Sequence, residues 1–399
     1  MDREESVSTR QAWIIAVLLW ASVVGLTATE IAPASVLTLV ASDLGIGRTG
    51  VSWLVSVFLL GMVVAALPAG VLLDRVNNRH VVLVVAVFYL LSTGWTTLAA
   101  ESGDLASLLA ARFLGGVANV TIWTAAINVV GTVFGPTRQG TSIGFITTSI
   151  PVGFAVAHTT VPGIAGAVGW ESSFVVFGLL TLSSAVVFWI YVRDLPLRTR
   201  FETPARSEVG AVLRNPIVWA VAVLAFAAFS LNMFFNNWLP SYLVEQFGVG
   251  VAAGGLFAAA FPAVGALARF ASGAMSDRLY GGRRKPIVLG SFLVIAPLIV
   301  VIAGVRSIVV LLVLLVVAGF VTQMGLALLL PYVRELVDPN VAATSVSILN
   351  LVGLTGAFSA PVLTGFLIDL TGAYTAAFAY ATGLALLGIL VAWLAPEPG

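Results

Sequence analysis

The sequence lacks cysteine, and it has two histidines and a single lysine. Without cysteine, the chain has no disulfide, thiolate metal ligand or cysteine nucleophile. The histidines, His80 and His158, are too far apart in sequence to form a His-Glu-x-x-His zinc site. Lys285 follows Arg284 rather than glycine, which excludes a phosphate-binding P-loop, and no Gly-x-Ser-x-Gly elbow occurs. We therefore predict no enzyme activity, no catalytic residue, no metal and no cofactor, so any work on a solute must draw on a gradient or on exchange.

Charge is also scarce along the chain. Charged residues make up 9% of it, against about 25% in a soluble protein. Apolar residues make up 59%, and the mean hydropathy is +1.06. A chain of this composition cannot cover itself with polar side chains, so its solvent must be a lipid bilayer. The net charge of +1, without a basic tract interleaved with aromatics, excludes nucleic acid as a partner.

Long apolar runs are what the sequence has in abundance. About 20 apolar residues cross a bilayer as a helix, and this length divides the chain into twelve predicted spans. In the first half they are roughly 12–40, 51–73, 80–100, 105–134, 140–168 and 171–192, and in the second half roughly 215–245, 251–276, 286–304, 307–334, 342–370 and 374–395. We predict an all-α membrane protein with one six-helix half at 1–192, a cytoplasmic linker at 193–214 and a second six-helix half at 215–399.

The arginines predict the orientation. Cation-rich loops stay on the cytoplasmic side of a membrane, and here Arg48 and Arg306 are the cations that fall in loops on the other side. Both termini are therefore predicted to be cytoplasmic in a multi-pass protein of the plasma (cytoplasmic) membrane. The first apolar run is too long for a signal peptide and has no small-residue cleavage site, so we expect it to stay in the protein. We expect the linker to be a solvated tether, with a regulatory or partner-binding role as the alternative.

A charged turn occurs once in each half. Residues 70–79 read Gly-Val-Leu-Leu-Asp-Arg-Val-Asn-Asn-Arg, and residues 273–285 repeat the Gly-x-x-x-Asp-Arg pattern before further cations. A second motif, Pro-x-x-x-Gly, begins at Pro162 and again at Pro361, and its small-residue spacing lets membrane helices approach closely. Repetition of both motifs indicates two related halves in one chain.

On these turns the chain resembles the major facilitator superfamily, which carries such a loop after its second and eighth helices. The resemblance covers essentially the whole chain and implies two pseudo-symmetric six-helix halves around a midplane site, working by alternating access. In that family the loop aspartate and arginines pair across the two halves and hold the cytoplasmic side closed. Carried over to this sequence, the gate residues are Asp74, Arg75, Arg79, Asp277, Arg278, Arg283 and Arg284.

Ionisable residues inside the predicted spans are the most informative ones. A charge at the centre of a membrane helix costs about 2.5–3.5 kcal/mol on insertion scales, so each one requires a partner or a task. Glu30 and Arg112 lie at comparable depth by the helical rise, and we predict a pair that protonation of Glu30 opens. The alternative is a static clamp. The sequence Arg-Phe-Leu-Gly-Gly at 112–116 resembles the family's helix 4 signature, and the acid shortly before Pro33 resembles proton-linked drug exporters.

A second arginine, Arg269, lies near mid-membrane on the eighth predicted span. A guanidinium offers two parallel donors to a planar oxyanion. The pattern Arg269-x-x-x-Gly273 resembles monocarboxylate and oxalate carriers, in which this arginine meets the substrate carboxylate. The oxalate carrier's second cation is replaced here by Asn350, and the additional helix 2 arginine of nitrate porters is missing. An anion receptor and a structural pairing are therefore both open for Arg269.

Polar side chains complete the predicted site. His158 is a candidate proton relay or substrate donor, or else a hydrogen-bonded packing residue. Asn232 and Asn236 are four apart and share one helix face, and the family lines its central path with helices 1, 4, 7 and 10. The predicted substrate-binding residues are Arg269, Arg112, Asn119, Trp123, Asn232, Asn236, Gln323 and Asn350, and the predicted proton-coupling residues are Glu30 and His158.

The predicted function is secondary active transport of a small organic or inorganic anion coupled to protons, by symport or antiport, in a functional monomer. One alternative is proton-driven efflux of lipophilic compounds, which the helix 1 acid and the many aromatics favour. A more distant alternative is a non-transporting membrane sensor built on a carrier scaffold. Short loops argue against the sensor, because a sensor requires a cytoplasmic surface for its partner.

Overall fold

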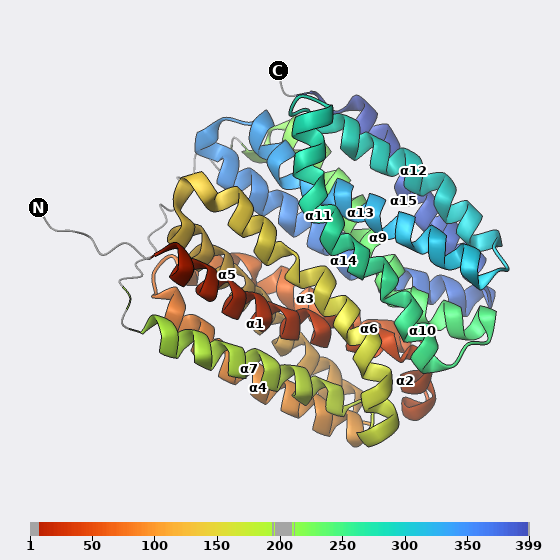
Figure 1. The fold of residues 1–399 in the computed structure, drawn as a ribbon. Helices are drawn as coiled ribbons and strands as arrows, with labels where there is room; N and C mark the ends of the chain where they lie inside the picture. The colour runs from red at the N-terminus through yellow and green to blue at the C-terminus, as the bar shows by residue number, and fades with distance from the viewer. Residues whose placement is uncertain (1–7, 194, 196–209, 211, 398–399) are drawn as a thin grey trace, which may run out of the picture.

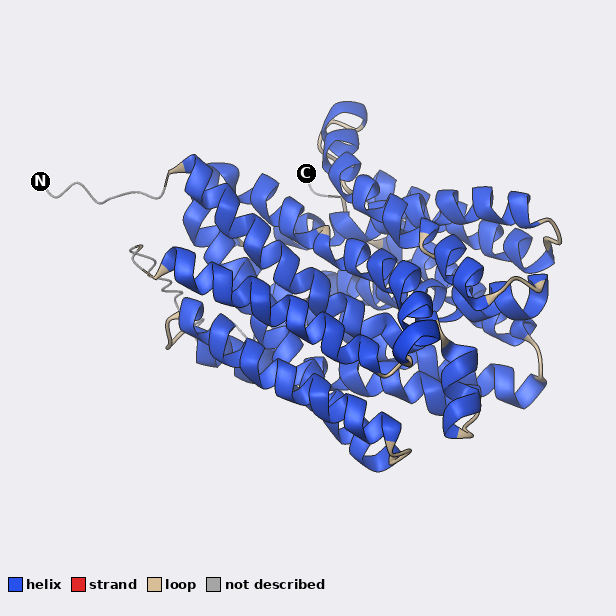
Figure 2. Ribbon diagram, turned by 60° about the horizontal axis from the view of Figure 1, so that its bottom comes forward, coloured by secondary structure: helices blue, strands red, loops and turns tan. Residues whose placement is uncertain are grey.

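The computed structural model describes residues 8–193, 195, 210 and 212–397, and within them every regular element is a helix (Figure 2). Twelve helical segments of this described part are long and apolar enough to cross a membrane, as the sequence predicts. Most of the predicted linker at 193–214 lies outside the described residues.

The first six spans pack beside one another as one half of the molecule, coloured red to yellow-green in Figure 1. Their helices are α1 (Thr9–Ser35), α2 (Leu37–Leu44), α3 (Arg48–Leu73), α4 (Asn78–Glu101), α5 (Leu105–Thr147), α6 (Ser149–Val168) and α7 (Ser172–Val192).

The last six spans form the other half, coloured green to blue in Figure 1. They comprise α9 (Pro216–Phe247), α10 (Val251–Ala258), α11 (Ala260–Leu279), α12 (Lys285–Gly304), α13 (Ile308–Leu336), the short 3-10 turn η1 (Pro339–Val341), α14 (Ala342–Thr371) and α15 (Tyr374–Leu394). Because the spans alternate in direction, α1 begins and α15 ends at the same end of the bundle, which we call the terminal face. The other end, which holds Arg48, is the opposite face.

Several spans that the sequence predicts as single helices are interrupted, and proline explains two of the breaks. Proline has no N–H and its ring clashes with the carbonyl four residues earlier. α5 ends at Thr147, four residues before Pro151, and α10 ends at Ala258, four residues before Pro262. The turn between the fourth and fifth spans is made by Gly135, whose φ of 65° lies in the left-handed region that favours glycine.

The two halves meet along two helix pairs related by the repeat. In one pair, a Cβ at Gly365 of α14 would lie 2.8 Å from the Ser52 hydroxyl of α3, so glycine permits the close approach that the Pro-x-x-x-Gly motif predicts. A Cβ at the matching Gly166 would meet no atom within 4 Å. The prediction that this second copy of the motif mediates a close helix approach is therefore wrong. Close approach in the second pair is provided instead by Gly255 of α10, where a Cβ would lie 2.3 Å from the His158 carbonyl oxygen of α6.

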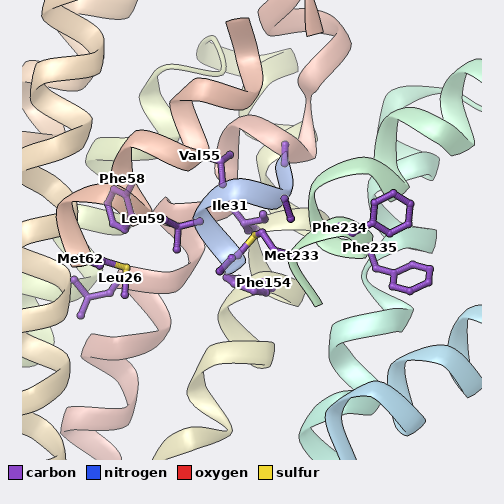
Figure 3. Close-up of a cluster of buried hydrophobic side chains, with 14 of the residues drawn as sticks. Leu26, Ile31, Val55, Phe58, Leu59, Met62, Phe154, Met233, Phe234 and Phe235 are labelled. Carbon is purple, nitrogen blue, oxygen red and sulfur yellow. The ribbon is translucent and has the colours of Figure 1, made fainter. Parts of the chain in front are cut away.

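An apolar cluster joins the halves between these helix pairs. Figure 3 shows Met233 of α9 beside Ile31 of α1 and Phe154 of α6, all of them buried. On the other side of α9, the Phe235 ring stacks on Phe261 at a centroid distance of 4.8 Å. α9 therefore packs on both halves, and its polar residues are held at the boundary between them.

Polar contacts also join the halves at the opposite face. Arg48 Nη2 lies 2.7 Å from Glu245 Oε2, and Asp369 accepts hydrogen bonds from the Thr49 amide at 2.9 Å and from its hydroxyl at 2.6 Å. Each of these contacts pairs the start of α3 with an end of α9 or α14. Arg48 is predicted from the sequence to lie in a loop outside the membrane, but its partners follow only from the tertiary structure.

The predicted gate residues lie at the terminal face, and their observed contacts stay within one half. Arg284 pairs with Asp277 at 2.8 Å and with Glu335 at 3.0 Å, all in the second half. Arg79 donates to main-chain carbonyls at the end of α7, including that of Arg193 at 3.0 Å. The contacts of Arg79 and Arg284 therefore differ from the pairing across the halves that the family resemblance implies, and the gate role stays a prediction. The other predicted gate residues are Asp74, Arg75, Arg278 and Arg283, of which all but Asp74 are exposed.

Candidate functional site

Arg269 lies on α11 with its guanidinium at the boundary between the two halves. Its Nε donates to Gln323 Oε1 of α13 at 2.9 Å, and its Nη1 donates to the Thr147 carbonyl oxygen of α5 at 2.6 Å. The first contact stays within the second half, whereas the second reaches the first half. Arg269 is half-buried rather than enclosed. The guanidinium is thus oriented by both halves, with one hydrogen-bond acceptor in each.

A chain of amide side chains continues from Arg269 to α9. Gln323 Nε2 donates to Asn232 Oδ1 at 2.8 Å, and Asn236 Nδ2 donates to the Asn232 main-chain oxygen at 2.8 Å. The two asparagines share a face because they are four residues apart. Glycine at 265 makes room for the chain, since a Cβ there would lie 2.5 Å from Gln323 Cγ. The structure therefore brings together four of the predicted substrate-binding residues.

The partners of Arg269 are neutral. An amide oxygen and a main-chain carbonyl accept its hydrogen bonds, and within the described residues no carboxylate forms an ion pair with it. Neutral acceptors orient a guanidinium without cancelling its charge. A buried charge normally requires a counter-charge, because its removal from water costs several kcal/mol. The arrangement can therefore attract a planar oxyanion to the free edge of the guanidinium.

His158 of α6 lies beyond Asn236 and is fully buried. Its Nδ1 lies 2.9 Å from the Ser35 hydroxyl of α1. Its Nε2 has no hydrogen-bond partner among the described residues, and neither has Asn236 Oδ1, although the two side chains lie close enough to interact. His158 thus places a ring nitrogen of the first half against the amide chain of the second half.

Arg112 is not part of this chain. Its guanidinium donates to three main-chain oxygens, those of Leu54 at 2.8 Å, Thr29 at 2.9 Å and Glu30 at 2.8 Å. The side chain is 1% exposed, and the Phe58 ring lies 4.5 Å from its central carbon. The predicted contact of Arg112 with substrate therefore does not fit this conformation, because its donors are used to join α5 to α1 and α3.

The predicted Glu30–Arg112 ion pair is absent from the described residues. Arg112 contacts the main-chain oxygen of Glu30 rather than its carboxylate, although Glu30 is buried, with 4% of the residue exposed. Pro33 supplies no N–H to the carbonyl of Thr29, four residues earlier, and that oxygen accepts a hydrogen bond from Arg112 at 2.9 Å. Arg112 joins α5 to α1 and α3 through main-chain oxygens, so the contact differs from the predicted side-chain pair, whether switchable or static. The proton-coupling role of Glu30 stays a prediction.

Three other predicted residues lie outside the hydrogen-bonded chain. Asn119 is buried and its Nδ2 has no partner among the described residues. Trp123 and Asn350 are half-buried. Thr147, whose carbonyl oxygen accepts from Arg269, and Ser35, whose hydroxyl contacts His158, are not among the residues predicted from the sequence. Pro151, four residues after Thr147, was the signal that could have identified the free carbonyl.

Comparison with known proteins identifies the family of the chain. The Major Facilitator Superfamily model matches residues 14–358 and 255–399. The chain is 28% identical over 373 residues to a hexuronate transporter of Bacillus subtilis (strain 168), an alignment that covers 87% of this chain and 86% of that protein. It is 24% identical over 359 residues to a probable L-galactonate transporter of Escherichia coli (strain K12), covering 83% and 78%. A probable nitrate/nitrite transporter of Mycobacterium tuberculosis is 28% identical over 270 residues, covering 67% of each chain.

Solved structures show the same fold. The crystal structure of a bacterial homologue of the human lysosomal transporter Spinster, in an inward-facing and occupied conformation, superposes with a TM-score of 0.80 at 16% identity. That match covers 97% of both chains. The twelve spans, the two packed halves and the family match together show that this chain is an integral, multi-pass membrane protein belonging to the Major Facilitator Superfamily, a family of non-enzymatic carriers.

Proposed function

We propose that the protein carries a small organic or inorganic anion across the membrane and that Arg269 receives the anion. One observation carries this proposal: a half-buried guanidinium, oriented by Gln323 and the Thr147 carbonyl, has no counter-charge among the described residues. An anionic substrate supplies that counter-charge when it binds. Bidentate contact with a carboxylate or nitrate then uses the planar fork of the guanidinium.

The relatives support the same class of substrate. Hexuronate, L-galactonate and nitrate, which appear in their names, all carry a delocalised negative charge. They differ in size and in hydroxyl content, so what they share is the oxyanion. Arg269 matches this shared feature, and the amides of Gln323, Asn232 and Asn236 add hydrogen-bonding groups for the rest of the substrate.

We infer that the carrier works by alternating access, with the terminal face in the cytoplasm. The arginines of the charged turns lie at the terminal face, which the positive-inside rule assigns to the cytoplasm. The contacts of Arg48 and Thr49 close the opposite face in this conformation. Opening that face requires these contacts to break while the halves close around the terminal face.

The test is uptake into proteoliposomes made from the purified full chain. Radiolabelled glucuronate, galactonate and nitrate are supplied with an inward proton gradient, and a lipophilic cation is tested for export in parallel. We expect uptake of at least one anion. Its initial rate should fall at least tenfold in Arg269→Ala and stay unchanged in Arg306→Ala, because Arg306 is an exposed loop residue. Anion uptake that survives Arg269→Ala overturns the proposal. Transport of the lipophilic cation alone supports the efflux alternative.

A further inference from the structure

Both membrane arginines bind a main-chain carbonyl that a proline has freed. A proline cannot donate to the carbonyl four residues earlier in a helix. Pro33 thereby frees the Thr29 carbonyl, which accepts from Arg112 Nη1 at 2.9 Å. Pro151 frees the Thr147 carbonyl, which accepts from Arg269 Nη1 at 2.6 Å. An unpaired carbonyl inside a membrane costs free energy, so each arginine satisfies a requirement that the proline creates.

The two arginines use this acceptor differently. Arg112 also donates through Nε and Nη2, and its side chain is 1% exposed. Arg269 is half-buried, and its Nη2 makes no hydrogen bond to any residue that the structure describes. Arg112 therefore uses Nε, Nη1 and Nη2 to hold the helices together, whereas Arg269 is oriented by Nε and Nη1 and keeps Nη2 for another acceptor.

We propose that Pro151 is a positioning residue for the anion site. By freeing the Thr147 carbonyl, it fixes the guanidinium plane of Arg269 from the first half, so that the remaining N–H groups face the substrate. This rests on the proposed function of Arg269. It adds that the anion receptor has one neutral anchor in each half, Gln323 and Thr147.

The anchor in the first half links anion binding to movement of the halves. Thr147 and Pro151 belong to the fifth span, whereas Arg269 and Gln323 belong to the eighth and tenth. When the halves move relative to one another, the Thr147 oxygen moves relative to Gln323. The orientation of the guanidinium, and with it the affinity for the anion, then changes between the two states of the carrier.

The experiment is a double-mutant cycle on anion uptake in proteoliposomes. In Pro151→Ala the new N–H competes with Arg269 for the Thr147 oxygen, so we expect KM to rise about tenfold, as for loss of a hydrogen bond to a charged group, with a smaller change in kcat. In an Arg269→Lys background the same substitution changes KM less than twofold. If Pro151→Ala raises KM equally in the parent protein and in Arg269→Lys, Pro151 has a purely structural role and the proposal is overturned.

The matched control is Pro162→Ala in the same span. The carbonyl that Pro162 frees, that of His158, faces Gly255 rather than a side-chain donor. Both variants thus remove a proline from the same span, but only Pro151→Ala affects a carbonyl that contacts Arg269. We expect Pro162→Ala to change KM less than threefold. A rise equal to that of Pro151→Ala would assign the effect to helix shape and contradict the proposal.

A measurement without substrate separates this inference from the proposed function. The cysteine-free chain accepts a pair of nitroxide labels at Thr141→Cys and Leu279→Cys, both exposed near the terminal face. We expect Pro151→Ala to broaden the distance distribution toward longer distances, and to have no further effect in Arg269→Ala. An unchanged distribution overturns the positioning role. If no anion is transported, the proposed function fails, while the distances still decide whether Pro151 acts through Arg269.

Discussion

The two arginines Arg112 and Arg269 have different surroundings, although both lie within apolar spans. Arg112 is enclosed and satisfies three main-chain oxygens of α1 and α3. Arg269 is half-buried between the halves and has neutral partners on two sides. From sequence both are charges within apolar spans that call for a partner. Arg112 uses three of its donor groups on main-chain oxygens, and this difference from Arg269 supports the anion-receptor role that we propose for Arg269 alone.

Removal of the Arg112 guanidinium is expected to lower stability rather than to change substrate affinity. In Arg112→Met three main-chain oxygens lose a charged donor, so we expect the free energy of unfolding to fall by about 2–3 kcal/mol. Thermal unfolding of the purified protein in detergent measures this, with Arg306→Met as the surface control. A variant of normal stability with a raised KM would instead place Arg112 in the substrate site.

Glu30 provides a separate prediction about coupling. Its carboxyl group is 4% exposed, and no described residue forms an ion pair with it. If it carries the coupled proton, Glu30→Gln holds the site in a permanently neutral form. We expect uptake by the parent protein to vary with external pH and uptake by Glu30→Gln to be independent of it. Initial rates across mildly acidic to mildly alkaline buffers decide this, and a retained pH dependence would exclude the role of Glu30.

At the scale of the helices, glycine and proline decide where two elements can touch. A Cβ at Gly116 of α5 would lie 1.8 Å from the Phe58 carbonyl of α3, and a Cβ at Gly61 of α3 would lie 2.2 Å from the Phe113 carbonyl of α5. This contact brings α5 close enough for Arg112 to reach Leu54. The second half repeats it, since a Cβ at Gly319 of α13 would lie 2.3 Å from the Phe261 carbonyl of α11.

Gly116→Ala is expected to force α5 away from α3. Backbone atoms cannot move aside as a flexible side chain can, so overpacking should cost about 1–3 kcal/mol. Gly163→Ala is the matched control, because a Cβ there meets nothing within 4 Å and the helix propensity of alanine is higher. We expect Gly116→Ala to lower Tm and Gly163→Ala to leave it equal or higher. Equal Tm values for the two variants would contradict the close approach.

At the scale of the whole molecule, the described polar contacts differ between the two faces of the bundle. Arg48, Glu245, Thr49 and Asp369 join the halves at the opposite face. At the terminal face, Arg284 pairs with Asp277 and Glu335 of its own half. The conformation described is therefore closed at the opposite face.

Arg48→Ala is expected to shift the carrier toward the conformation that is open at the opposite face. The ion pair is partly exposed and so contributes at most about 1 kcal/mol, which corresponds to about a fivefold change in the equilibrium. A single cysteine at Ser52, buried against Gly365 in this conformation, reports the opening by its rate of maleimide labelling. We expect a severalfold faster rate in Arg48→Ala and no change in Arg306→Ala. An unaltered rate would show that the pair does not hold this face closed.

The sequence by itself determined the membrane class, the twelve spans and the two related halves, because composition, run length and repetition express these properties locally along the chain. It also predicted a substrate site of eight residues, of which the structure joins Arg269, Gln323, Asn232 and Asn236 in one hydrogen-bonded chain. Only the tertiary structure decided that Arg112 binds main-chain oxygens instead of the Glu30 carboxylate, and that Thr147 anchors Arg269. The physical reason is that a free carbonyl is created locally by a proline, whereas the donor that satisfies it comes from whichever helix the packing brings within reach.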